Sequence, residues 1–235
     1  MSEFEEKWTM HGRVWDDPER VKSPDELIAY IDRVGFLPLF RCDVAGCSVE
    51  EQVSDLYWWS DDTAQDPWYW RTVLARSGRV GYGKLYGGKM GFVSLKWLPK
   101  LANLRREGYD FVSSAEEGRA GIREIKLMDL FEGTEALPSY EMKQRSGIKS
   151  FEGTLQRLQH GTYLLIRDFI QKVNKQGVPY GWNIAVYSPP ERIWGEAMVR
   201  SAYSESPEKS AEDILEFLKG LYPGAGAEQL KRLIF

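Results

Sequence analysis

Few side chains in this sequence have the types and spacing that metal binding or nucleophilic catalysis requires. The chain has two cysteines, Cys42 and Cys47, and two histidines, His11 and His160. A structural zinc site takes four sulfur or nitrogen ligands, usually in closely spaced pairs, so we expect no metal site in a single chain. The cysteines are interpreted as unpaired thiols in a reducing compartment. No residue is assigned a catalytic role.

An aromatic cluster spans Tyr57–Arg71, where the sequence is YWWSDDTAQDPWYWR. Aromatic side chains at this density either bury apolar area in a core or offer faces on which unpaired bases and flat ligands stack. The core interpretation is favoured because buried aromatic side chains are the commoner case. The four candidates for an aromatic pocket are Trp58, Trp59, Trp68 and Trp70. The nearest carboxylates, Asp61, Asp62 and Asp66, could activate water but are better interpreted as solvated loop and helix-capping residues.

Positive charge is concentrated in the middle of a chain whose formal net charge is −4. Residues 1–117 carry 15 Lys and Arg against 20 Asp and Glu, residues 118–190 carry 10 against 7, and residues 191–235 carry 6 against 8. A surface that faces phosphates needs clustered positive charge, so the middle segment is the expected contact with double-stranded DNA. Polar side chains on a helix there could also read base edges. The predicted nucleic-acid contacts are Lys143, Arg145, Lys149, Gln156, Arg157, Gln159, His160, Lys172 and Lys175.

Periodicity predicts the elements that position these residues. Residues 121–133, 140–147 and 151–159 are expected to form helices, and His160 at the end of the third is interpreted as a cap or dipole partner rather than a catalyst. After Gly161 the period changes to two, and a polar turn at 174–177 is expected to join two antiparallel strands. Three helices followed by a hairpin are the order of a winged helix. That fold presents its third helix to the DNA major groove and its hairpin to the backbone or minor groove.

The N-terminal half is expected to be mainly helical. Capping signals at Ser23, Ser48 and Asp66 predict three helix starts, and alternation on both sides of Gly87-Gly88 predicts a β-hairpin. Pro99 is expected to kink or break the helix that follows this hairpin.

A polar stretch rich in serine and glycine predicts a domain boundary near residue 117. We expect an aromatic-rich helical region with a β-hairpin at 1–117, a winged helix at 118–190, and a C-terminal helical segment at 191–235 that packs as a partial second winged-helix unit. The fold class is then α+β, mainly helical, with a tandem winged-helix architecture and an aromatic-rich N-terminal half.

Four runs of sequence carry a resemblance to a known family: VGFLPLF, DPWYWR, GKLYGGKMGFVS and FEGTLQRLQHGTYL. They resemble the AlkZ-related proteins, which are distantly similar to the AlkZ/YcaQ family of bacterial winged-helix DNA glycosylases, and the likeness spans most of residues 21–235. It implies tandem winged helices, a cytoplasmic monomer, double-stranded DNA as partner, and no metal or organic cofactor. Active glycosylases of that family use a Gln-apolar-Gln motif to position water at the sugar of a flipped nucleotide. The best-placed counterpart here is Leu37-Pro38-Leu39, so no catalytic residue is carried over.

We therefore expect a DNA-binding winged-helix protein that resembles DNA glycosylases and recognises damaged or distorted duplex, whether or not it is an enzyme. Two alternatives stay open: a ligand-sensing regulator whose aromatic region holds a small flat molecule, and a protein-interaction scaffold. No apolar run approaches the ~20 residues of a membrane helix. The acidic start MSEFEEKW also lacks the features of a secretion signal. A cytoplasmic protein without membrane contact is expected.

Overall fold

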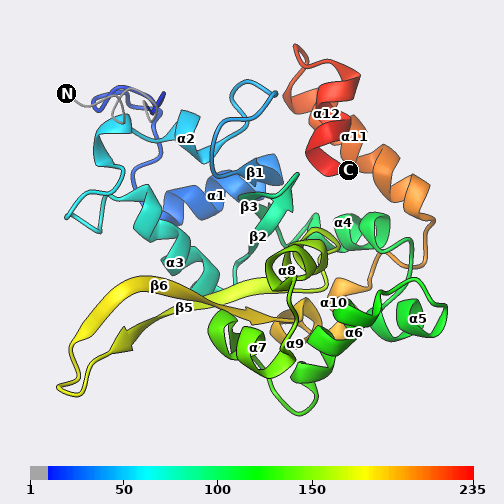
Figure 1. The fold of residues 1–235 in the computed structure, drawn as a ribbon. Coiled ribbons are helices and arrows are strands. Elements are labelled where there is room, and N and C mark those ends of the chain that lie inside the picture. The colour runs from blue at the N-terminus through cyan, green and yellow to red at the C-terminus, as the bar shows by residue number, and fades with distance from the viewer. Residues whose placement is uncertain (1–9) are drawn as a thin grey trace.

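The same order of helices and strands occurs twice in the computed structural model, which describes residues 10–235 and so leaves the acidic start MSEFEEKW outside it (Figure 1). The first unit (residues 24–94) consists of α1 (Pro24–Val34), β1 (Phe36–Pro38), α2 (Val49–Gln52), α3 (Pro67–Ser77), β2 (Val80–Tyr86) and β3 (Lys89–Ser94). The second unit (residues 122–188) consists of α6 (Ile122–Met128), β4 (Leu137–Pro138), α7 (Ser139–Ser146), α8 (Phe151–His160), β5 (Leu165–Val173) and β6 (Pro179–Ser188). Single 3₁₀ turns at Asp55–Tyr57 and Asp129–Phe131 lie within these units. Both sheets are antiparallel, and in each the last strand lies between the other two: β1-β3-β2 and β4-β6-β5.

Local capping determines where the helices of the first unit begin. The Ser23 hydroxyl accepts a hydrogen bond from the N–H of Glu26 at 3.2 Å, and the Asp66 carboxylate accepts one from Trp68 at 2.9 Å. Each satisfies one of the N–H groups that a helix start leaves without an intrahelical partner. The predicted starts are therefore confirmed at both places. The Ser48 start is confirmed as well, although α2 is only four residues long.

One local expectation between the units needs correction. Pro99 is the second residue of α4 (Leu98–Arg105), where its missing N–H costs no hydrogen bond, so it lies at the start of a helix rather than kinking or breaking one. The polar stretch before the expected boundary near residue 117 contains α5 (Phe111–Glu116), which the Asp110 side chain caps by accepting from Ser113 at 2.9 Å.

The β5–β6 ribbon is the most extended feature of the fold and projects beyond the helices (Figure 1). Its strands pair antiparallel, with Phe169 opposite Ala185 near the body and Lys172 opposite Tyr180 near the tip. The tip closes where Asn174 donates to the carbonyl of Val178 at 2.9 Å. The three helices, the pairing and the turn at 174–177 all agree with the sequence-based prediction. The short strand β4, which adds to the edge of β6, was not predicted.

A continuous apolar core joins the two units. Trp70 and Tyr82 of the first unit and Leu155, Leu158 and Phe169 of the second are buried in one cluster. Helix α3 packs on β5, and α8 packs on β2. The two units are therefore held together by burial of apolar area, the dominant favourable term in folding.

The C-terminal segment forms a second cluster against the first unit. It contains α9 (Pro190–Trp194), α10 (Glu196–Val199), α11 (Pro207–Leu221) and α12 (Ala227–Ile234), and α11 packs on α4. Residues 190–235 contain no strand. The second copy of the helix–strand order therefore lies at 24–94 and not in this segment. Within residues 10–235, no helix is both long enough and apolar enough to cross a membrane.

Candidate functional site

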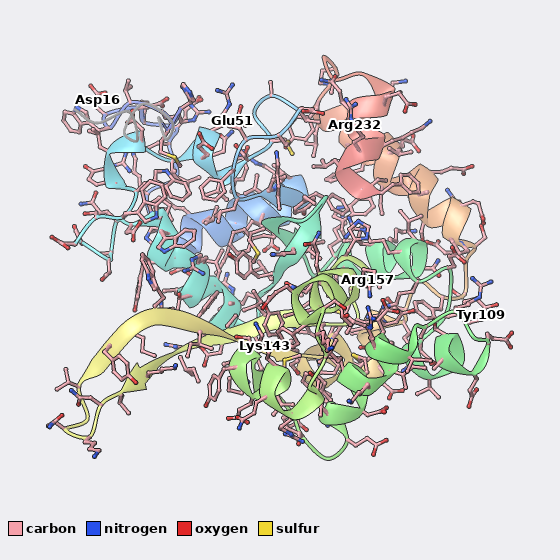
Figure 2. The ribbon with its side chains drawn as sticks, in the orientation of Figure 1. Asp16, Glu51, Tyr109, Lys143, Arg157 and Arg232 are labelled. Atoms are coloured by element: carbon pink, nitrogen blue, oxygen red, sulfur yellow. The ribbon has the colours of Figure 1, made fainter. Side chains whose placement is uncertain are left out.

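All six predicted lysine and arginine contacts in the second unit have exposed side chains: Lys143, Arg145, Lys149, Arg157, Lys172 and Lys175. Two of them, Lys143 on α7 and Arg157 on α8 (Figure 2), form ion pairs. Lys143 pairs with Glu152 at 3.3 Å and Arg157 with Glu124 at 2.5 Å. In residues 10–235 no carboxylate lies within 4.0 Å of the charged nitrogens of the other four. Their charge is available to a partner outside the chain.

The outer half of the β5–β6 ribbon adds aromatic groups to these charges. Trp182 is 84% exposed and Tyr180 is 52% exposed, and both lie on β6. Lys172 lies opposite Tyr180 in the register, and Lys175 lies in the turn. Sequence reasoning named only N-terminal tryptophans as candidates for an aromatic pocket and missed Trp182. The available signal was that residues 171–181 on both strands are mostly polar, so this part of the ribbon has no apolar face to bury.

Helix α8 packs with one face on β2 and is not free to read bases with that face. Gln159 is only 1% exposed, and its Oε1 accepts from the backbone N–H of Lys84 at 3.0 Å. Its Nε2 donates to the carbonyl of Leu155 at 3.4 Å. The prediction that Gln159 contacts DNA is therefore wrong, because both ends of its amide are used inside the protein. Gln156 is half-buried and lies against Gly88 of the β2–β3 turn.

His160 also faces the protein rather than a free surface. The imidazole is half-buried, and burial together with the nearby charge of Arg105 lowers its pKa to about 4. It is therefore uncharged at neutral pH and adds no attraction for phosphates. Its backbone carbonyl accepts from Arg105 at 3.0 Å, so it is Arg105 that caps the end of α8.

The N-terminal aromatic cluster divides into core and surface. Trp58 and Trp70 are buried, which agrees with the core interpretation. Trp59 is 47% exposed, and its ring centroid lies 6.3 Å from that of the half-buried Trp68. Of the four candidate tryptophans, Trp59 is the one that is exposed, because the Arg71 guanidinium lies over the Trp68 ring. Asp66, buried, accepts hydrogen bonds from the N–H groups of Trp59 and Trp68, each at 2.9 Å.

The carboxylates of this cluster have structural roles. Burial raises the pKa of Asp66, and the backbone hydrogen bonds it accepts act in the opposite direction. Asp62 accepts from the backbone N–H of Ala64 at 3.1 Å in an exposed turn, and Asp61 is exposed. This geometry is that of caps and turns, as expected from the sequence.

Arg71 connects the aromatic cluster to the ribbon, a role that sequence reasoning missed. Its guanidinium lies 3.8 Å from the ring centroid of Trp68 and 4.5 Å from that of Phe169 on β5. Cation–π contacts of this kind are strongest where water is excluded, and Arg71 is buried. Trp68 and the base of the ribbon therefore lie on the same side of α3.

The position that corresponds to the glycosylase motif lies in the core. Leu37 and Leu39 are both 0% exposed. The N–H of Leu37 donates to the hydroxyl of Tyr86 at 3.2 Å, and the N–H of Leu39 donates to the carbonyl of Met90 at 2.8 Å. Neither side chain has the chemistry or the access to act on a bound nucleotide.

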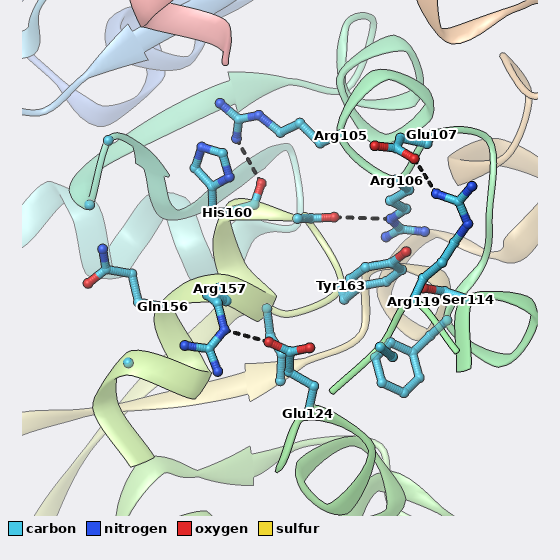
Figure 3. A pocket seen from close by; sticks show the side chains of 17 residues that line it. Arg105, Arg106, Glu107, Ser114, Arg119, Glu124, Gln156, Arg157, His160 and Tyr163 are labelled. Carbon is cyan, nitrogen blue, oxygen red and sulfur yellow. Dashed lines mark hydrogen bonds and ion pairs between the residues drawn. The ribbon is translucent and has the colours of Figure 1, made fainter. Parts of the chain in front are cut away.

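A cavity of about 860 Å³ opens beside α8, and we call it the inter-unit cavity (Figure 3). Its walls come from the β2–β3 turn, the end of α4, α5, the start of α6, and α8. Gln156, Arg157 and His160 line it, together with Arg105 and Tyr163. Three residues predicted to meet DNA are thus brought together around a hollow instead of along an open helix face.

Comparison with known proteins identifies the family to which the chain belongs. A family profile described as AlkZ related matches residues 21–235. The chain belongs to the AlkZ-related family. No curated protein and no solved structure matches it. The matched range of the AlkZ-related chain includes both units, the inter-unit cavity and the C-terminal helices.

Proposed function

We propose that this AlkZ-related protein binds double-stranded DNA through the β5–β6 ribbon and recognises damaged or distorted duplex. Both units have the helix–strand order and the sheet order of a winged helix, which supports a tandem winged-helix architecture. The family relates the chain to DNA glycosylases by name. A cytoplasmic monomer, implied by that relationship, is part of the proposal.

The observation that carries the proposal is the exposed tip of the ribbon. Lys172 and Lys175 supply positive charge for backbone phosphates, while Tyr180 and Trp182 supply flat apolar faces on the same projecting element. Side chains of this kind insert between base steps where stacking is already weak, which costs least at a damaged or mismatched position. Because α8 packs on β2, we expect the ribbon rather than this third helix to contact DNA.

We propose further that the protein does not excise bases. Cleavage of a nucleosidic bond builds positive charge on the sugar, and the enzyme must hold a water molecule and hydrogen-bonding groups around it. Buried leucines at positions 37 and 39 supply neither.

The experiment is a fluorescence-anisotropy titration of intact duplex and of duplex with one abasic site. We expect the double variant Lys172→Glu/Lys175→Glu to weaken binding of both duplexes and to lower the slope of log K against log salt by about two. The matched control is Lys219→Glu, an exposed lysine on α11 far along the chain from the ribbon. Equal binding by the ribbon double variant and the wild-type protein would refute the ribbon as the DNA contact.

A further inference from the structure

The inter-unit cavity has the size of a small-molecule site and walls with both polar and apolar groups. At about 860 Å³ it falls within the usual range of ligand pockets. The wall is open at Gly153 of α8, where an added Cβ would meet only Nη1 of Arg157, at 3.9 Å, and Gly88 lies against the Gln156 amide. The cavity is therefore bounded by groups able to hydrogen-bond on this side and by apolar side chains, Phe111 and Leu158 among them, elsewhere.

Arginine outnumbers carboxylate around the cavity. Arg105, Arg106, Arg119 and Arg157 line it, against Glu107 and Glu124. Because His160 is uncharged at neutral pH, the lining carries a net charge of +2. A hollow with walls of low dielectric and one sign of charge concentrates ions of the opposite sign.

Arg105 keeps its charge without a carboxylate partner. It donates to three backbone carbonyls, those of Ile234, His160 and Leu85, at 2.9, 3.0 and 2.6 Å. In the part of the chain that the structure describes, no carboxylate lies within ion-pair distance of it. These bonds cap the ends of α8 and α12 and use three of its five N–H donors. Arg106, by contrast, pairs with Glu191.

Two further arginines at the rim have glutamates as their ion-pair partners. Arg157 pairs with Glu124 at 2.5 Å, and Arg119 pairs with Glu107 (Figure 3). The Arg119–Glu107 pair is exposed at both side chains and so contributes little to stability, whereas Arg157 is exposed but its partner Glu124 is mostly buried. A phosphate offers the same guanidinium two or three oxygens and can replace the carboxylate without loss of hydrogen bonds.

Groups that suit a flat ring lie on two sides of the cavity. On one side Phe111 and Tyr163 meet edge to face, with centroids 5.2 Å apart, and the Arg106 guanidinium lies over the Tyr163 ring. On the other side lie Gln156, whose side-chain amide makes no hydrogen bond within residues 10–235, and the neutral imidazole of His160 (Figure 3). Amide and imidazole groups can donate to and accept from the edge of a heteroaromatic base.

From this arrangement we propose that the inter-unit cavity binds a mononucleotide unit, with its phosphate on Arg157 and its base against Gln156 and His160. Two sources offer that chemistry: a free nucleoside monophosphate, and the 5′-phosphorylated end of a DNA strand. The site is separate from the ribbon contact under Proposed function and does not depend on it.

The test is isothermal titration calorimetry with adenosine 5′-monophosphate, adenosine, and short duplexes with 5′-phosphate or 5′-hydroxyl ends. We expect the monophosphate to bind and adenosine to bind at least tenfold more weakly. If only the phosphorylated duplex end binds, and more tightly than the hydroxyl end, the source is the strand terminus.

The decisive variant is Gly153→Phe, which fills the cavity while replacing a glycine within a helix, so folding is expected to be retained. It should weaken binding at least tenfold, and Arg157→Gln should do the same. The controls are Glu152→Phe, one residue away on α8 and outside the cavity lining, and Lys143→Gln. Unchanged affinity in Gly153→Phe, or no binding of any phosphorylated ligand at millimolar concentration, would overturn the proposal. The double variant Lys172→Glu/Lys175→Glu should bind the monophosphate as the wild-type protein does, which separates this site from the DNA-binding ribbon.

Discussion

The side-chain oxygen of Gln159 on α8 accepts a hydrogen bond from the backbone N–H of Lys84 on β2, 3.0 Å away, across the boundary between the two units. Gln159 is buried, so no water replaces this bond if it is lost. A residue that looked suited to reading DNA bases instead holds the two units together.

Gln159→Leu should therefore destabilise the protein. The change leaves the N–H of Lys84 without its partner inside the protein, which costs about 1–3 kcal/mol. Urea denaturation measures the free energy of unfolding, and Gln144→Leu on the exposed face of α7 is the matched control. A loss no greater than that of the control would show that the bond between the units contributes nothing.

Arg71→Met should also lower stability, because methionine fills a similar space but carries no charge to lie over Trp68 and Phe169. The expected loss is about 1–2 kcal/mol for a cation–π contact shielded from water. Arg79→Met is the control, since Arg79 is exposed and pairs only with the exposed Asp25. The midpoint of thermal unfolding is measured for the wild-type protein and for both variants. Equal midpoints for Arg71→Met and Arg79→Met would contradict the prediction.

Incubation of excess protein with alkylated duplex should produce no abasic sites above a control without protein. Alkaline strand cleavage under single-turnover conditions measures this. Leu37→Gln/Leu39→Gln should not create activity, and each buried amide should cost about 1–3 kcal/mol of stability. Base release by the wild-type protein would refute the inactive interpretation, and its loss in Asp61→Asn, Asp62→Asn or Asp66→Asn would then identify the carboxylate responsible.

Trp182→Ala should weaken binding to duplex with an abasic site more than binding to intact duplex, because a flat side chain inserts most easily where stacking is broken. Trp182 is 84% exposed, so the thermal midpoint should hardly change. Trp15→Ala, an exposed tryptophan outside the ribbon, should leave both affinities unchanged. Equal losses on the two duplexes would argue against insertion at the lesion.

The pH dependence of stability should carry a contribution from His160. Its pKa is lowered to about 4 in the folded protein, from an ordinary value near 6.5, so the unfolded chain binds more protons between these values. Stability from this group is complete above pH 6.5 and falls as the pH drops toward 4. His160→Asn should flatten the dependence in this window. The free energy of unfolding of both proteins, measured between pH 4 and 7, tests this prediction. Parallel dependences on pH would contradict the lowered pKa of His160.

The positions where helices begin and where the ribbon turns follow from the sequence alone. Ser23 and Asp66 begin helices and Asn174–Gly177 closes the ribbon, because each signal acts on backbone groups only a few positions away. The exposed lysines of the second unit were predicted for a similar reason, since charged side chains stay in water unless a partner is supplied.

Which of the remaining polar and aromatic residues are free depends on how the two units pack together. Gln156 and Gln159 are three positions apart on one helix, yet one lines a cavity and the other is buried against β2. Trp70 and Trp182 are the same residue type in the core and at the ribbon surface. These differences depend on which surfaces of the two units meet. The packing of apolar faces far apart in the sequence determines that contact, and local periodicity carries no information about it.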